Sequence, residues 1–158
     1  MKQEETDFIE AGSGEKVILV HSSVAGAKQW RSLMETLSND FHVIAINLFG
    51  YGNTCFWEND GKQRLEDQAR LIEPFLPTGA DKISIVGHSF GGSVAMKAAA
   101  MFKMKVRRLV LIEPNPFYLL KKYGRPEAYH EAVTLRDAIK LNGRAGTWEA
   151  AAEVFANY

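Results

Sequence analysis

The sequence predicts an α/β fold built on a doubly wound, mostly parallel β-sheet. Three observations carry this prediction: short apolar runs without alternation, helical patterns between them, and one strand–turn–helix signature around a serine. Strands buried on both faces of a parallel sheet are typically near-continuous apolar runs. The four runs of this kind are Val17–Val20, Val43–Ile46, Ile83–Val86 and Leu109–Ile112. A chain of 158 residues is long enough to bury a sizeable core.

Helical patterns separate these four runs. The first places its apolar residues on one face, and Trp30 and Met34 are expected in the core with Leu33 and Leu37. The second contains Leu65, Ala69, Ile72 and Phe75 and is expected to end near Pro77. The third follows the serine turn, with core contacts expected from Val94, Ala95 and Ala98. The β-α-β-α-β-α-β order is typical of a doubly wound sheet with right-handed crossovers.

The character of the chain changes after the fourth run. Pro114 and Pro116 interrupt the pattern, and two helical patterns follow from Pro126 on. One helix is predicted over Pro126–Leu141 with Gly143 just past its end, and another over Trp148–Phe155 with Thr147 as its N-cap. Since neither helix leads into a further strand, we divide the chain into a sheet part, residues 1–116, and a helical part, residues 117–158.

The bulk composition excludes several classes of protein. Nineteen acidic residues balance nineteen basic ones, so charge gives no reason to expect nucleic acid or an anionic membrane as partner. Cys55 is the single cysteine, which excludes a disulfide framework and a cysteine-based metal site, and its thiol is expected to be buried or inert. The polar N-terminus lacks an apolar signal segment, and no apolar run reaches membrane-spanning length, so a cytoplasmic protein is expected.

The stretch Gly87-His88-Ser89-Phe90-Gly91 follows the third apolar run and opens the third helix. This G-x-S-x-G pattern in a strand–turn–helix context predicts a nucleophile elbow, in which Ser89 is strained and exposed. The flanking glycines allow the strand and the helix to pass close together. The helix N-terminus behind the serine offers N–H groups to a developing oxyanion. The alternative interpretation is an ordinary tight turn.

Four segments together resemble the α/β-hydrolase superfamily, in its serine-nucleophile branch with a helical cap. Besides the elbow, they are Val17–Ser23, similar to the strand that ends in the family's His-Gly oxyanion turn; Asn47–Thr54, similar to its D-x-x-G-x-G-x-S loop; and Leu109–Pro114, similar to the strand before the cap. The resemblance implies that residues 1–116 are the N-terminal part of the hydrolase core. It also implies that residues 117–158 begin the cap.

The chain departs from the family pattern in ways that bear on activity. Ser22 replaces the glycine of His-Gly, and Asn47 replaces the loop aspartate. The family's triad acid and histidine follow two further strands, which these residues do not contain. The Leu109–Ile112 strand would then be an unpaired edge, through which the chain is expected to self-associate. We expect little or no esterase activity from these 158 residues alone.

The candidate catalytic residues follow from the elbow and the chain order. Ser89 is the nucleophile, and Glu113 as the acid and His130 as the base follow it in the family's chain order. By resemblance, the backbone N–H groups of Phe90 and Ser23 form the oxyanion hole, provided the first and third strands lie side by side. In the alternative interpretation, Ser22 and Ser23 have a structural role and cap the first helix.

Three further residues are predicted on the substrate side of the site, and each has a structural alternative. They are His21, Ser22 and His88. A structural role holding the loop is favoured for His21, and His88 is expected to pack beneath the elbow.

The predicted function is a serine hydrolase that acts on an ester or related carbonyl substrate, a small molecule, by acyl transfer through Ser89. The alternative is a non-catalytic fragment that binds a ligand or a partner chain. A serine at the elbow argues against the branches with an elbow aspartate, such as epoxide hydrolases. No nucleotide-binding glycine motif is complete, and no metal or organic cofactor is implied.

Overall fold

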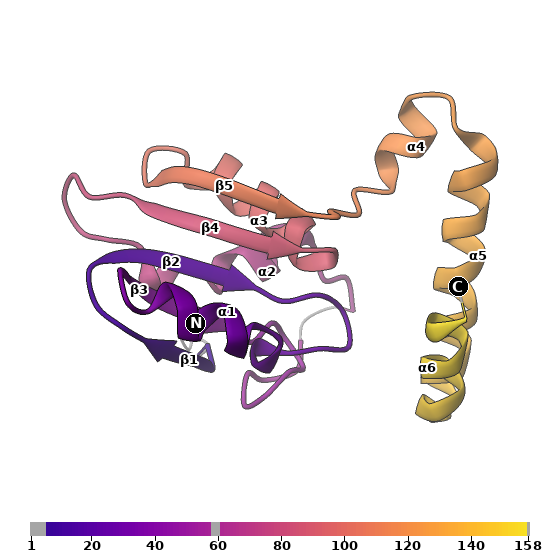
Figure 1. Cartoon of the computed structure of the whole chain (residues 1–158). Coiled ribbons are helices and arrows are strands. Elements are labelled where there is room, and N and C mark those ends of the chain that lie inside the picture. Colours follow the sequence, from indigo (N-terminus) through magenta and orange to yellow (C-terminus); the bar gives the residue numbers. More distant parts are fainter. Residues whose placement is uncertain (1–5, 58–60, 158) are drawn as a thin grey trace. The chain divides into compact units, whose positions relative to one another are not determined.

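The computed structural model describes residues 6–57 and 61–157 and contains a five-stranded, mostly parallel sheet (Figure 1). The strand order is β1-β3-β2-β4-β5, and only β1 runs antiparallel to its neighbour. The strands are β1 (Phe8–Ala11), β2 (Glu15–Val20), β3 (Phe41–Ile46), β4 (Ile83–His88) and β5 (Val106–Ile112). All four predicted strands are therefore present. The predicted fold class is confirmed.

Strand β1 was not predicted. Its four residues pair with β3 in antiparallel register, from Phe8 opposite Ile46 to Ala11 opposite Val43. The strand lies at the sheet edge and alternates exposed and half-buried residues. A four-residue alternation is too short to distinguish a strand from a loop by its sequence pattern.

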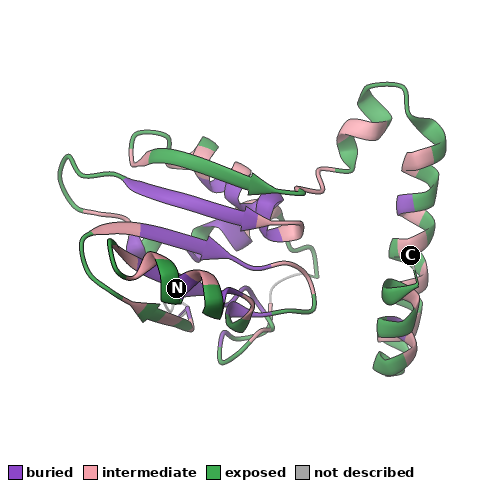
Figure 2. Ribbon diagram, in the orientation of Figure 1, coloured by how far each residue is buried: buried purple, intermediate pink, exposed green. Residues whose placement is uncertain are grey.

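The sheet is covered on both faces, because successive side chains of each strand point to opposite sides. Ile18, Ile44 and Ile85 face the cluster that includes residues of α2 and α3. Val17, Leu19 and Val43 face the cluster that includes Trp30 and Met34. Figure 2 shows the central strands β2 and β4 buried between these layers. This explains why the buried residues Val17–Val20 of β2 form a continuous apolar run instead of alternating with polar residues.

The helices of this part are η1 (Ala27–Trp30), α1 (Arg31–Leu37), α2 (Leu65–Arg70), η2 (Glu73–Phe75) and α3 (Phe90–Met101). The predicted second helix is divided, because Pro74 enters the short 3₁₀ turn η2 after α2 has ended. The core contacts expected from Val94, Ala95 and Ala98 on α3 are confirmed, since all three are fully buried.

A second compact unit begins at Pro116, after a first one that ends at Asn115. It contains α4 (Tyr118–Lys122), which was not predicted, with α5 (Pro126–Arg144) and α6 (Trp148–Ala156). Gly143 was predicted beyond the longer helix but lies within it, and Gly146 takes the positive φ of 75° after the helix ends. Thr147 precedes α6, yet its hydroxyl donates to the carbonyl of Asn142, at 3.0 Å, and does not cap the helix.

Two surface features of the described residues complete the fold. β5 pairs with β4 alone, and Leu109–Ile112 are each 37–48% exposed. Cys55 is exposed, so the first half of the expectation that its thiol is buried or inert was wrong, and the second half stays a prediction. Within the described part of the chain, no helix combines the length and the apolar character needed to cross a bilayer.

Candidate active site

Ser89 lies in the sharp turn between β4 and α3, which we call the Ser89 turn. Its backbone has φ 52° and ψ −117°, a conformation that costs a non-glycine residue of order 1–3 kcal/mol. The two glycines of the motif make room for this turn. A Cβ on Gly87 would collide with the carbonyl of Gly91, and a Cβ on Gly91 would collide with the carbonyls of Val20 and His21.

A second turn, over Ser22–Gly26, follows β2. Its left-handed residues are Val24, with φ 57°, and Gly26, with φ 78°. Ser22, which stands where the family has glycine, therefore needs no positive φ. Side chains hold this turn: the N–H of Val24 donates to Tyr51 Oη at 2.8 Å, and the N–H of Ala27 donates to Asn47 Oδ1 at 2.8 Å. The alternative that Ser22 and Ser23 cap the first helix was wrong, because Gly26 precedes η1 and no side chain caps it.

The two turns meet at one end of the sheet, because β2 and β4 are adjacent and parallel, with Val20 opposite Gly87. This confirms the neighbouring strands that the predicted oxyanion hole requires. The N–H groups on either side of Ser23 are both paired: that of Ser22 donates to Gln29 Oε1 at 3.0 Å, and that of Val24 donates to Tyr51 Oη. The N–H of Ser23 itself donates to no described residue. The N–H of Phe90, at the first position of α3, likewise has no partner among the described residues.

His21 is fully buried, so the prediction that it contacts substrate was wrong. Its Nε2 accepts a hydrogen bond from the backbone N–H of Leu48, at 3.1 Å. Nδ1 lies 2.6 Å from the carbonyl of Ser22 and must therefore carry the proton. Burial lowers the pKa of His21 below its ordinary value, because the imidazolium loses its hydration. These contacts support the favoured interpretation, in which His21 has a structural role and holds the loop.

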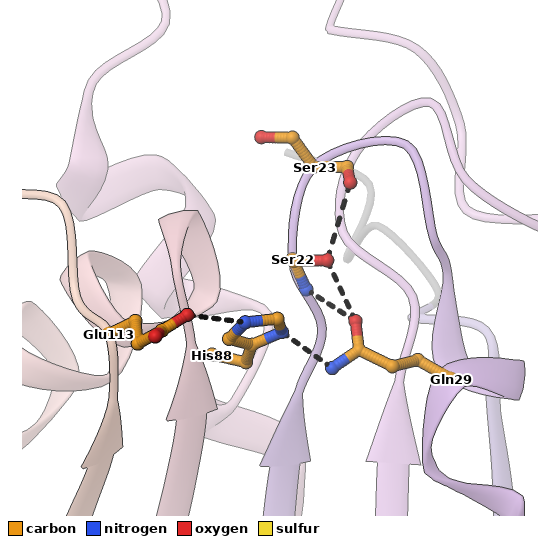
Figure 3. A network of polar contacts seen from close by, with 5 residues as sticks. All are labelled: Ser22, Ser23, Gln29, His88 and Glu113. Carbon is orange, nitrogen blue, oxygen red and sulfur yellow. Dashed lines mark hydrogen bonds and ion pairs between the residues drawn. The ribbon is translucent and has the colours of Figure 1, made fainter. Parts of the chain in front are cut away.

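His88 is half-buried and lies at the carboxyl end of β4 between Gln29 and Glu113 (Figure 3). The expectation that it packs beneath the turn stays a prediction. Nδ1 of His88 lies 3.0 Å from Gln29 Nε2, and Nε2 lies 3.9 Å from a carboxylate oxygen of Glu113. The hydroxyl of Ser22 donates to the same glutamine, at 2.8 Å. The substrate-side roles of Ser22 and His88 stay predictions.

The predicted acid and base stand in different units. Glu113 follows β5 with φ 44°, and its side chain is 88% exposed. His130 is exposed on α5, in the second unit. Among the described residues, no histidine or carboxylate hydrogen-bonds to the hydroxyl of Ser89. The roles of Glu113 and His130 therefore stay predictions.

Comparison with known proteins decides the family. The family model of the alpha/beta hydrolase fold matches residues 16–142. This chain belongs to the α/β-hydrolase family. A serine hydrolase of known structure, involved in carbazole degradation, superposes with a TM-score of 0.61 at 30% identity, over 69% of this chain and 43% of that one.

Two curated relatives are hydrolases with different names. The chain is 33% identical over 113 residues to a 2-hydroxy-6-oxo-6-(2'-aminophenyl)hexa-2,4-dienoic acid hydrolase of Metapseudomonas resinovorans. This match covers 68% of this chain and 38% of that protein. It is 32% identical over 114 residues to a soluble epoxide hydrolase of Corynebacterium sp. (strain C12), over 69% and 38% of the two chains. The chain thus spans about two fifths of the length of these relatives.

Sequence reasoning missed the side chains that hold the Ser22–Gly26 turn. Gln29 belongs to no motif and to no apolar period, and Tyr51 stands at a variable position of the Asn47–Thr54 loop, where the motif specifies no residue type. The only available signal was proximity, since Gln29 lies seven residues after Ser22.

Proposed function

We propose that the protein is a serine hydrolase in which Ser89 attacks the carbonyl carbon of an ester or related substrate. The backbone N–H groups of Phe90 and Ser23 stabilise the tetrahedral oxyanion, and the leaving group departs to give an acyl-enzyme. Water then attacks the acyl carbon and releases the acid, regenerating Ser89. The similarity to a serine hydrolase of known structure supports this assignment.

The observation that carries the proposal is the pair of unpartnered N–H groups beside Ser89. The first N–H groups of a helix have no partner within it, and the N–H of Ser23 has none among the described residues, so two donors at the ends of adjacent strands are open to a ligand. An oxyanion between them would satisfy both donors at once. The positive end of α3, which is 12 residues long, adds to this stabilisation.

The nucleophile also needs a base that takes its proton. His21 does not serve, because backbone groups occupy both of its ring nitrogens. Nδ1 of His88 is occupied by Gln29. We therefore assign the base either to His130, with Glu113 as its acid, or to the part of the hydrolase fold that this chain does not span.

A second candidate is a non-catalytic fragment that binds a ligand or a partner chain. The absence of a hydrogen-bonded base at Ser89 among the described residues favours it. Under this interpretation the two open donors bind an anionic or carbonyl oxygen without turnover.

Labelling with a fluorophosphonate distinguishes the two candidates. The protein purified from its native source is weighed intact and then treated with the probe, and the adduct is located by peptide mass spectrometry. We expect the adduct on Ser89, no labelling of Ser89→Ala, and full labelling of Ser13→Ala, a control at an exposed serine.

The same treatment of the 158-residue chain locates the base. Labelling of this chain, lost in His130→Ala, supports the pair of His130 and Glu113. If a longer native protein is labelled and the 158-residue chain is not, the base belongs to residues outside this chain. Failure of both to react contradicts the hydrolase and supports the binding fragment.

A further inference from the structure

Gln29 bridges the two turns of the candidate site (Figure 3). Its carboxamide oxygen accepts from the N–H of Ser22 at 3.0 Å and from the Ser22 hydroxyl at 2.8 Å. Its amide nitrogen lies 3.0 Å from Nδ1 of His88, across 59 residues of sequence. The glutamine is half-buried on η1, so packing limits its side-chain conformations.

The orientation of this carboxamide follows from its partners. The oxygen and nitrogen of a glutamine are distinguished by the hydrogen bonds around them. A backbone N–H is always a donor, so the atom that faces Ser22 must be the oxygen. The NH₂ group then faces His88 and donates to it.

The donor from Gln29 in turn fixes the state of His88. Nδ1 accepts and carries no proton, so the ring is neutral and its proton is on Nε2. Nε2 points toward Glu113, whose carboxylate lies 3.9 Å away. A protonated imidazole has two donors and no acceptor, so it is incompatible with the hydrogen bond to Gln29.

We propose that Gln29 is a positioning residue that clamps the Ser22–Gly26 turn to His88 and so presents the N–H of Ser23 to the oxyanion. The clamp takes up the N–H of Ser22, and Tyr51 takes up that of Val24, which leaves Ser23 as the single open donor of the three. The role in catalysis rests on the proposed function. The clamp itself does not.

The test uses the 158-residue chain and two substitutions of one residue. Gln29→Glu keeps an acceptor for Ser22 but turns the donor that faces His88 into a second acceptor. Gln29→Leu removes all three hydrogen bonds of the carboxamide at similar volume. Lys28→Ala, an exposed neighbour, is the matched control. ¹⁵N NMR of the imidazole rings, assigned with His88→Asn, reports which nitrogen of His88 is protonated, and amide relaxation reports the order of Ser23.

We expect an unprotonated Nδ1 on His88 in the wild type and in Lys28→Ala, and a protonated Nδ1 in Gln29→Glu. We also expect a lower order parameter for the Ser23 amide in Gln29→Leu. A protonated Nδ1 in the wild type, or the same nitrogen state in Gln29→Glu, overturns the clamp. A packing role alone would leave the tautomer unchanged, and the glutamate variant decides the matter if the leucine variant does not fold.

The catalytic part is tested on the fluorophosphonate-reactive protein. There, Gln29→Leu should lower the labelling rate of Ser89 by about 10-fold or more, whereas Lys28→Ala should not change it. An unchanged rate overturns the positioning role while leaving the serine hydrolase intact. A wild type that does not react contradicts the proposed function, and the NMR result then judges the clamp separately.

Discussion

The backbone N–H of Ser89 donates a 2.9 Å hydrogen bond to the carbonyl of Ile112, which fastens the Ser89 turn to the end of β5. On the opposite side, Gly91 lies directly against the carbonyls of Val20 and His21 at the end of β2. The strained backbone of Ser89 is thus held from two neighbouring strands. Strain persists where the surroundings determine the conformation, as they do here.

Replacing Ser89 by glycine should stabilise the protein. Glycine adopts a positive φ without the steric cost that serine bears at φ 52°. We expect Ser89→Gly to raise the free energy of unfolding by about 1 kcal/mol relative to Ser89→Ala, which keeps the Cβ. Urea unfolding of both variants measures this difference. Equal midpoints would mean that the turn stores no such strain.

Replacing Gly91 by alanine should destabilise the protein strongly. The new methyl group would meet two backbone carbonyls that cannot move without disturbing β2. We expect a loss of about 3 kcal/mol or more in urea unfolding. Gly79→Ala is the control, since its Cβ meets nothing and only its φ of 73° is strained, which costs about 1–2 kcal/mol. A smaller loss at Gly91 than at Gly79 would contradict the close packing.

The parts of the site that sequence reasoning found are the local ones. The Ser89 turn follows from glycines, an apolar strand and a helix that are contiguous in the chain. Its neighbour across the sheet, β2, was placed correctly because buried parallel strands have a clear apolar signature. Both results depend on residues whose environment is set within a few positions.

The clamp of Gln29 on His88 was not predicted, because it joins two segments 59 residues apart through polar side chains. Hydrophobic periodicity carries no information about such a contact. The positive φ at Val24 was missed for a related reason: tertiary contacts with Tyr51 impose it on a β-branched residue that disfavours it. Only the assembled sheet brings these groups together.

Asn47 stands where the family has aspartate, and replacing it by aspartate should destabilise the protein. Its Nδ2 donates to Asp7 Oδ2 at 2.7 Å, so Asn47→Asp would place two carboxylates in contact. We expect a loss of about 1–3 kcal/mol in unfolding free energy at neutral pH. Asp7→Asn in the same chain should restore most of the loss, because an amide donor again faces a carboxylate. Additive effects in this double-mutant cycle would contradict the coupling.

The exposed apolar edge of β5 should make the chain self-associate. Within the described residues β5 pairs only with β4, and Val110 is 48% exposed. Since an open edge strand is a template for pairing, we expect concentration-dependent dimers in sedimentation velocity. Val110→Lys should weaken them, while Met104→Lys, an equally charged change outside the strand, should not. A monomer at every concentration would refute self-association.

His21 should make stability fall in acid. Its pKa is lowered in the fold from the ordinary 6.5, so the unfolded chain binds this proton more readily than the folded one. The free energy of unfolding therefore falls as the pH drops through 6.5 and levels off below the folded pKa. Urea midpoints between about pH 8 and about pH 5 measure this slope. His21→Asn, uncharged at every pH, should flatten it, whereas His42→Asn, at a half-buried histidine paired with Glu10, should leave the His21 contribution in place. If His21→Asn keeps the full slope, another group causes the loss of stability in acid. The hydrogen bonds that hold His21 neutral, to Leu48 and Ser22, would then not determine how the unfolding free energy depends on pH.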